Sequence, residues 1–273
     1  MSPLTEPTRI VLAKSWDLAG FDADAAAYIQ RVEWADTTPL EATTRTAINN
    51  FVVGCKADGT WSAIKASCIL AGARTLAGAL MPLVGGAPTN FNFVSGDYNR
   101  KTGLVGNGST KYLNSNRNNN VDPQNSFHMV SYVSYNVATN TYQPIMGTID
   151  YFATNLLVID NRSTSGIQPF LRGLNYPGGM IPITQSGFIG ASRNSPTTVS
   201  SRAGSTNYSR SSSSEPPDTK SIMIFSAYST QPNNLSPTFS SGRIAFYSIG
   251  ESLNLTLLDT RVTALITAIG TAF

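Results

Sequence analysis

The sequence predicts a mainly β fold, a β-sandwich that follows a small α-helical unit. Three observations support this. From about residue 75 onward, short apolar stretches recur roughly every ten residues between Gly, Asn and Pro turns, without helical segments between them. The 273-residue chain is 41% hydrophobic, enough for a core, but only 13% charged, against about 25% in typical domains. The chain also ends in a clear strand followed by a clear helix.

The first 72 residues differ from the rest. Residues 1–20 are predicted as an N-terminal arm whose short apolar run, residues 10–13, forms an edge strand or an extended segment. Residues 21–72 are predicted as a helical N-terminal unit that serves virion anchoring or oligomerisation, and residues 73–273 as the sandwich with its C-terminal helix. The helical unit is too small to be expected to stand alone.

Helix signals in this unit are of unequal strength. A first helix is predicted from an N-cap at Asp22 to about Asp36, with apolar residues at helical spacing: Ala25, Tyr28, Ile29 and Val32. A second is predicted from the N-cap Thr38, with Glu41 completing a capping box, to Gly54. A third short helix is predicted from Trp61 to about Ala71.

The remaining segments favour strands. Predicted strands cover residues 76–83, short pieces of 98–113, and residues 127–133, 144–148, 156–160, 167–171, 187–191, 221–228 and 242–249. Residues 114–120 are predicted as an Asn-rich loop. Residues 192–219, rich in Ser and Thr, are predicted as short polar strands joined by long loops.

The last segment has the clearest pattern. Ile244, Phe246 and Ser248 alternate with Ala245, Tyr247 and Ile249, as expected of a strand. After Gly250 the period changes, and the apolar residues of 251–273 recur at helical spacing: Leu258, Val262, Leu265, Ile266 and Ile269. We therefore predict a closing strand of the sandwich, covered by an amphipathic helix.

Charge and cysteine content exclude several classes of protein. Residues 1–58 carry a net charge of −3 and residues 59–273 carry +6, but the basic residues are scattered singly, whereas a nucleic-acid site would need a patch.

No signal peptide is recognised. The most apolar stretch, residues 69–87, contains Arg74, so membrane insertion is not expected. Cys55 and Cys68 lack the spacing of a zinc site, and whether they pair stays open.

Three stretches resemble the laminin-G-like, concanavalin A-like jelly roll in the form found in virion proteins of tailed bacteriophages. They are residues 103–113 (GLVGNGSTKYL), residues 126–133 (SFHMVSYV), and the closing unit from Tyr247 into the helix that carries Leu253, Leu257, Leu258 and Val262. The lead-in segments 58–64 and 80–83 look similar too. The resemblance covers residues 58–273. It implies a fold and a virion setting, with assembly in the host cytoplasm, but no reaction.

The residues for chemistry are sparse. The closest acidic pair beyond residue 59, Glu215 and Asp218, is separated by two prolines, so the paired carboxylates of a glycosidase are not expected. The single histidine, His128, is predicted to be a packed or surface strand residue. Asp150 and Asn155 resemble a lectin calcium loop only vaguely. No catalytic residue, metal ligand or cofactor is therefore predicted.

Two functions remain from the sequence. The first is a non-enzymatic structural protein of a tailed-phage virion, a decoration, fibre or tail component in contact with other capsid or tail proteins. A homo-oligomer is expected, with a trimer as one form. The second is an adhesin that binds host-surface carbohydrate. Residues 114–120 with Arg117, or the segment Tyr208-Ser209-Arg210, carry suitable side chains, although both are also ordinary turn residues. Glycan-binding residues are not assigned.

Overall fold

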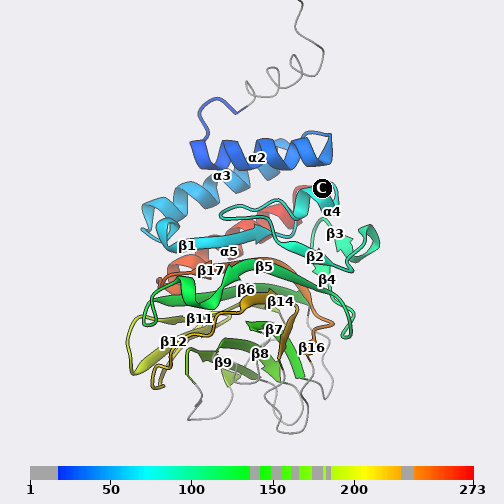
Figure 1. Ribbon diagram of the computed structural model, residues 1–273. Coiled ribbons are helices and arrows are strands. Elements are labelled where there is room, and N and C mark those ends of the chain that lie inside the picture. The colour runs from blue at the N-terminus through cyan, green and yellow to red at the C-terminus, as the bar shows by residue number, and fades with distance from the viewer. Residues whose placement is uncertain are drawn as a thin grey trace, which may run out of the picture.

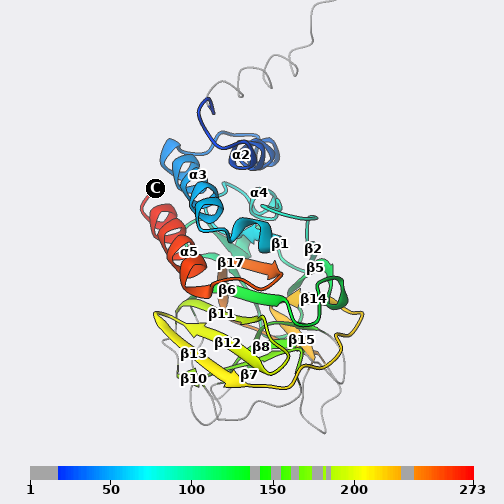
Figure 2. The same cartoon turned by 90° about the vertical axis from the view of Figure 1, so that its left-hand side faces the viewer.

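Two stacked β-sheets lie beneath a layer of helices. The computed structural model describes residues 18–135, 142–148, 155–160, 166–173, 181–182, 186–228 and 237–273. In these residues an eight-stranded sheet lies between the helices and a seven-stranded sheet (Figures 1 and 2). The prediction of a mainly β sandwich with a small N-terminal helical unit is confirmed.

The sheet next to the helices has the strand order β13-β12-β11-β6-β17-β4-β3, and β1 pairs with β17 on the same edge as β4. Its strands are β1 (Ile64–Ile69), β3 (Tyr98–Asn99), β4 (Gly103–Val105), β6 (Phe127–Tyr135), β11 (Gly187–Arg193), β12 (Thr198–Ala203), β13 (Thr206–Ser211) and β17 (Arg243–Gly250).

The second sheet has the order β10-β9-β8-β7-β14-β5-β2. Its strands are β2 (Thr89–Phe91), β5 (Tyr112–Asn118), β7 (Tyr142–Thr148), β8 (Asn155–Asp160), β9 (Gly166–Leu171), β10 (Ile181–Pro182) and β14 (Ser221–Ile224). A separate pair is formed by β15 (Ser226–Tyr228) and β16 (Pro237–Phe239). The predicted strand 221–228 is thus split in two at Phe225, whose φ is 68°.

The helices form the third layer. They are α2 (Ala23–Asp36), α3 (Ala42–Ala57), the single turn α4 (Leu76–Ala79) and α5 (Leu255–Gly270), with short 3₁₀ segments η1 (Trp61–Ala63), η2 (Ser95–Asp97) and η3 (Asn119–Val121). Asp22 caps α2 as predicted, because its side chain accepts a hydrogen bond from the Asp24 backbone N–H at 3.0 Å.

The central sheet separates two hydrophobic cores. One core joins α2, α3 and α5 to the outer face of β17, β6 and β11 through Phe246, Val130 and Phe188. Phe51 of α3 meets Phe246 edge-on, with ring centroids 5.6 Å apart. The other core lies between the two sheets and includes Tyr247 of the same strand. The alternation along β17 thus supplies both cores, while the division of the chain into units 21–72 and 73–273 stays a prediction.

One predicted helix and one predicted strand, both close to the boundary between the helical unit and the sandwich, were wrong. The third helix is instead η1 followed by strand β1. β1 is buried along nearly its whole length and pairs with β17, so its apolar residues contact both cores and their helical spacing is misleading. The strand predicted at 76–83 is a single turn, α4. There Asp36 accepts bonds from the backbone N–H groups of Arg74 and Thr75, and Thr75 caps the turn.

The start of the second helix was also placed wrongly. α3 begins at Ala42 and continues past Gly54 to Ala57. Glu41 does not complete a capping box. Its carboxylate instead binds Arg100 and Arg74, at 2.6 and 3.1 Å. These ion pairs tie the helical layer to the connections that lead into the sandwich.

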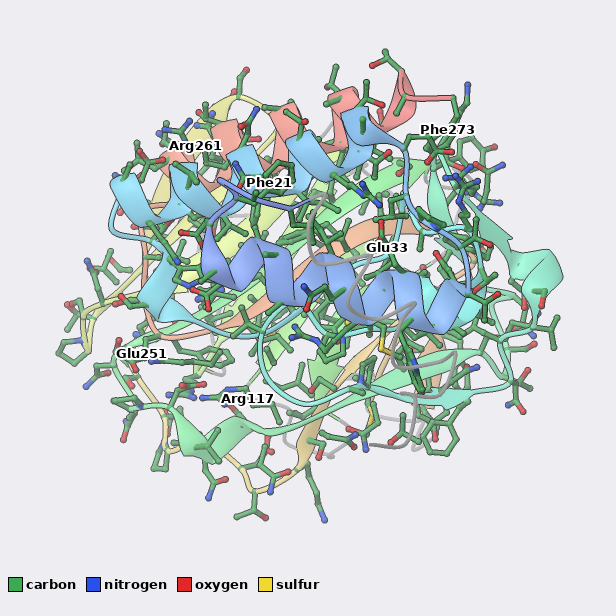
Figure 3. All side chains as sticks on the ribbon, turned by 90° about the horizontal axis from the view of Figure 1, so that it is seen from above. Phe21, Glu33, Arg117, Glu251, Arg261 and Phe273 are labelled. Atoms are coloured by element: carbon green, nitrogen blue, oxygen red, sulfur yellow. The ribbon has the colours of Figure 1, made fainter. Side chains whose placement is uncertain are left out.

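The closing strand and helix are confirmed as β17 and α5. Seen from above, α5 runs beside α3, with Arg261 and Phe273 toward opposite ends of the helix (Figure 3). Arg261 donates two hydrogen bonds to Asp58 just beyond α3, at 2.7 and 3.0 Å. The Arg100 guanidinium lies 3.9 Å from the centre of the Phe273 ring. The helix therefore covers the sandwich, and it is held by Arg261 near its middle and by Phe273 just beyond its C-terminal end.

Candidate functional site

The start of α5 lies beside strand β11 of the sheet next to the helices (Figure 2). A polar groove is lined by the residues at the start of α5 and by residues of β11, β12 and β13. Its volume is 590 Å³, within the range of about 300–1,000 Å³ typical of small-molecule sites. We call it the α5 groove. It is lined by Ser192, Asn194, Ser200, Ser201, Asn207, Tyr208, Ser209, Ser252, Leu253, Asn254, Leu255 and Thr256.

The strand wall of the α5 groove is the hairpin of β12 and β13. Ser200 pairs with Ser209, and Arg202 pairs with Asn207. Directly opposed residues of an antiparallel pair lie on the same face, and neighbours along a strand alternate. Arg202 reaches Asp259 of α5. The face of Ser200, Asn207 and Ser209 is therefore the face toward the helix.

Tyr208 lies on the opposite face of β13. It is paired with Ser201, and its half-buried ring packs against the core between the two sheets. Tyr208 consequently borders the α5 groove with its backbone. Of the predicted sugar-binding segment 208–210, Tyr208 and Ser209 line the groove, and the side chains that face it are those of Ser209 and the preceding Asn207.

The helix wall is the link from β17 into α5. The Ser252 backbone N–H donates to Ser126 Oγ, and the Leu253 N–H donates to Ser192 Oγ, both at 3.1 Å. A Cβ atom at Gly190 of β11 would lie 2.6 Å from Val130 Cγ2 and 3.3 Å from Leu255 Cδ2, so this glycine permits tight packing of β11 against β6 and the start of α5. This wall was missed in the sequence. Asn254 before an apolar periodic run is an N-cap signal that could have indicated it.

His128 lies under this link and is fully buried, so of the two alternatives that the sequence left open, packed or surface, the structure has the packed one. Its Nδ1–H donates to the Glu251 carbonyl at 2.5 Å, and Ser248 Oγ–H donates to Nε2 at 2.8 Å. Burial lowers the pKa of His128 to about 4. At neutral pH the imidazole is therefore uncharged, with both nitrogens satisfied, and it supports the helix wall of the groove.

The other predicted sugar-binding region uses its polar side chains internally. Residues 114–118 belong to strand β5, so the predicted loop 114–120 was wrong. Arg117 binds Asp122 through Nε and Nη2 at 2.9 and 2.5 Å. Asn116 donates to the Ala87 carbonyl and to Thr89 Oγ1. Few of these groups are left to meet a ligand.

Two fully buried arginines, Arg172 and Arg193, bind backbone carbonyl groups near this region. Arg172 donates to the backbone carbonyls of Asn119, Asp122 and Pro123, and its guanidinium lies 4.0 Å from the centre of the Phe127 ring. Arg193 donates to the carbonyls of Leu171, Ser195 and Ser212. Burial lowers the pKa of Arg172 to about 10, so it stays charged at neutral pH. Nothing in the sequence indicated that these two arginines are buried.

The remaining candidates do not form a site in the part of the chain that the structure describes. Asp218 accepts bonds from Asn119, Thr148 and the Lys220 N–H. Within that part no cluster of three His, Cys, Asp or Glu residues could hold a metal ion, and no helix is long and apolar enough to span a bilayer. The suggested calcium loop, residues 150–155, lies outside the described residues apart from the backbone of Asn155.

The two cysteines are separate. Cys55 and Cys68 are both free and buried, and they belong to different cores. Burial raises the pKa of each thiol to about 12, so neither is a thiolate at neutral pH. Cys68 lies 3.4 Å from the Tyr247 hydroxyl.

No protein-family model matches the chain, and no curated protein sequence matches it. Solved structures do. A mutant of Trypanosoma rangeli sialidase that displays trans-sialidase activity is similar over 83% of this chain and 40% of its own, with 12% identity and a TM-score of 0.49. The enzymatically active domain of tailspike protein 2 from bacteriophage CBA120 is similar over 62% and 28%, with 18% identity and a TM-score of 0.39.

A third is domain 4 of the extracellular arabinanase AbnA from Geobacillus stearothermophilus, in complex with arabinotriose. It is similar over 65% of this chain and 82% of its own, with 11% identity and a TM-score of 0.40. This chain thus spans about two fifths of the sialidase. At these identities and TM-scores the similarities carry no argument for a particular reaction.

These neighbours nevertheless contradict one expectation from the sequence. They are a sialidase, an arabinanase domain and an enzymatically active tailspike domain. The prediction of a non-enzymatic structural virion protein is therefore wrong and is withdrawn. The virion part of that prediction rested on the resemblance, the low charge and the N-terminal charge asymmetry. The non-enzymatic part rested on the sparse acidic residues, and separation along the sequence is a poor guide to which side chains a β-sandwich brings together.

Proposed function

We propose that the chain binds carbohydrate in the α5 groove. The observation that carries this proposal is the composition of the lining. Among the described residues that line the groove, nine of the twelve carry a Ser or Thr hydroxyl or an Asn amide, and none is charged; one of the nine, Ser201, is paired with Tyr208 on the opposite face. Hydroxyls and amides can both donate and accept hydrogen bonds, which is what a polyhydroxylated ligand requires.

The groove also offers apolar contact. Leu253 is half-buried and Leu255 is buried with a small exposed fraction, and both stand on the helix wall. The ring C–H groups of a sugar can pack against such side chains, while its hydroxyls meet the strand wall. A site with an apolar wall and a few placed polar groups is the usual form of a small-molecule pocket.

The setting of this binding is part of the proposal. The sequence resemblance over residues 58–273 supports a laminin-G-like jelly roll carried on the particle of a tailed phage, where it acts as an adhesin for host-surface glycans. A homo-oligomer, with a trimer as one form, is the expected assembly. Mass spectrometry of purified particles and light scattering of the purified chain test this. Absence from particles would contradict the setting, and a monomer would contradict the assembly.

The binding itself is tested by filling the groove. Ser200 is exposed on the strand wall of the groove, and S200W places a large side chain there, in a strand, where aromatic residues are favoured. T206W is the matched control, because Thr206 is exposed on β13 but does not line the groove.

The proteins are compared on a glycan array, and the strongest oligosaccharide is then titrated by calorimetry. We expect S200W to weaken binding by a factor of ten or more and T206W to bind like the unmodified chain. The proposal fails if the unmodified chain binds no saccharide at millimolar concentration, or if S200W binds as well as T206W.

A further inference from the structure

We infer that the α5 groove selects neutral oligosaccharides, and that Asn207 is a specificity-determining residue, oriented by Arg202. This rests on the proposed function and adds the class of ligand and the residues that select it. The inference comes from the way the cationic groups around the groove are occupied.

Two charged side chains that join β12 to α5 beside the groove form a closed pair. Arg202 Nε donates to Asp259 Oδ2 at 2.7 Å, and each residue is 7% exposed. The second oxygen, Asp259 Oδ1, accepts from Thr263 Oγ1 at 2.8 Å. Arg202 is therefore neutralised within the protein, so its charge offers little attraction to a carboxylate or sulfate on a sugar.

The backbone N–H groups at the start of α5 are also already bonded within the protein. Free N–H groups at a helix N-terminus attract anions. Here the Asn254 side chain accepts from the N–H groups of Thr256 and Leu257, at 3.0 and 3.2 Å. A neutral cap thus takes the place that an anionic ligand group would need.

Asn207 is held between the two walls. Its Oδ1 accepts from Arg202 Nη1 at 2.7 Å, and its Nδ2 donates to Thr256 Oγ1 at 3.0 Å. These bonds fix which end of the amide is oxygen and which is nitrogen. Asn207 is nevertheless exposed at the groove. Its second Nδ2 hydrogen is therefore a donor of fixed direction, suited to the oxygen of a sugar hydroxyl.

The ligand class is tested on an array that holds neutral, sialylated, uronic-acid and sulfated oligosaccharides of two to six units. We expect the strongest signals from neutral members. The dissociation constant of the best one should change less than twofold between 50 and 500 mM NaCl, because no charge pair forms that salt could screen. Preference for acidic members, or a loss of affinity of more than fivefold with salt, would overturn the inference.

The role of Asn207 is tested with N207A, which should weaken binding about two- to tenfold, as expected for one lost hydrogen bond. N120A is the matched control, because Asn120 is an exposed asparagine outside the groove. If N207A binds like N120A, Asn207 does not select the ligand.

The positioning role of Arg202 needs a double-mutant cycle. R202K keeps the charge beside Asp259 but loses the fork that reaches Asn207. If Arg202 acts by orienting Asn207, R202K should weaken binding in the unmodified chain and have almost no further effect in N207A, whereas a general structural role would give additive losses. T256V, which removes the other partner of the amide, gives the same test should R202K not fold.

Failure of this inference can be told apart from failure of the proposed function. If S200W abolishes binding but N207A has no effect, the groove binds sugar and Asn207 does not determine which one. If S200W abolishes binding and acidic glycans are preferred, the groove binds sugar but does not select neutral ligands. If S200W has no effect, the groove is not the binding site and both proposals fall.

Discussion

Two regions of this sandwich contain the same kinds of polar residue but differ in whether those side chains are available to a ligand. Residues 114–120 and residues 207–210 are both rich in Asn, Ser and Arg, and the sequence predicted that residues 114–120 and 208–210 suit sugar hydroxyls. In the first, Asn116 donates hydrogen bonds to Ala87 and Thr89, and Arg117 donates to Asp122, so these side chains are already bonded within the protein. In the second, Ser209 faces an open groove, and Asn207, although bonded to Arg202 and Thr256, keeps one Nδ2 hydrogen for a ligand there. A polar side chain can recognise a ligand only with the bonds that the fold leaves unused.

The largest effect that we expect from a substitution near residues 114–120 is on the free energy of unfolding. R172M removes the buried guanidinium that holds the carbonyls of Asn119, Asp122 and Pro123. We expect a loss of about 3 kcal/mol or more in the free energy of unfolding, because several buried acceptors lose their charged donor. Urea denaturation measures it, and R210M is the control, since Arg210 is less buried. Equal midpoints for the two variants would contradict the structural role of Arg172.

The second largest expected effect is a loss of stability at acid pH, caused by protonation of His128, which supports the helix wall of the groove. The folded-state pKa of His128 is about 4, below the usual value of about 6.5. The unfolded chain therefore binds the proton more tightly. The contribution of His128 is fully present above pH 6.5 and is lost as pH falls toward 4, at about 1.4 kcal/mol per unit and about 3 kcal/mol in all.

Urea denaturation at several pH values measures this loss. Since His128 is the only histidine, the H128Q variant should show a flatter dependence between pH 6.5 and 4.5. The same slope in H128Q and in the unmodified chain would show that His128 is not the group that titrates.

The smallest effect compares one polar residue from each region. N116A loses two side-chain hydrogen bonds at a residue whose φ is 57°, a conformation that Asn tolerates better than Ala. We expect a loss of about 1–2 kcal/mol. S209A changes an exposed groove residue and should stay within about 0.5 kcal/mol. If S209A proved the more destabilising, the groove wall would be structural, like residues 114–120.

How far the sequence predicts this fold depends on the residues concerned. Asp22 with the helical spacing after it, and the change of period at Gly250, are local patterns, and α2, β17 and α5 follow from them. β1 was misassigned because it contacts two cores and shows no strand period. α4 replaced a predicted strand because Asp36, distant in sequence, binds its first backbone groups.

The candidate site was less predictable. Segment 208–210 was recognised, but the alternation that turns Tyr208 inward needs the register with Ser201. The opposite wall, residues 252–256, is more than forty residues further along the chain and meets β13 only in the folded protein. The burial of Arg172 and Arg193 likewise depends on carbonyls from distant loops. Hydrogen-bond partners of this kind cannot be read from composition or spacing.

The most direct test of the central claim is a titration followed by ¹H–¹⁵N NMR, with the oligosaccharide that binds best on the array. The structure predicts that the shifted backbone amides cluster at Ser200, at residues 207–209 and at residues 252–256, while those of residues 114–120 stay unchanged. Shifts centred on residues 114–120, or none in the α5 groove, would contradict it.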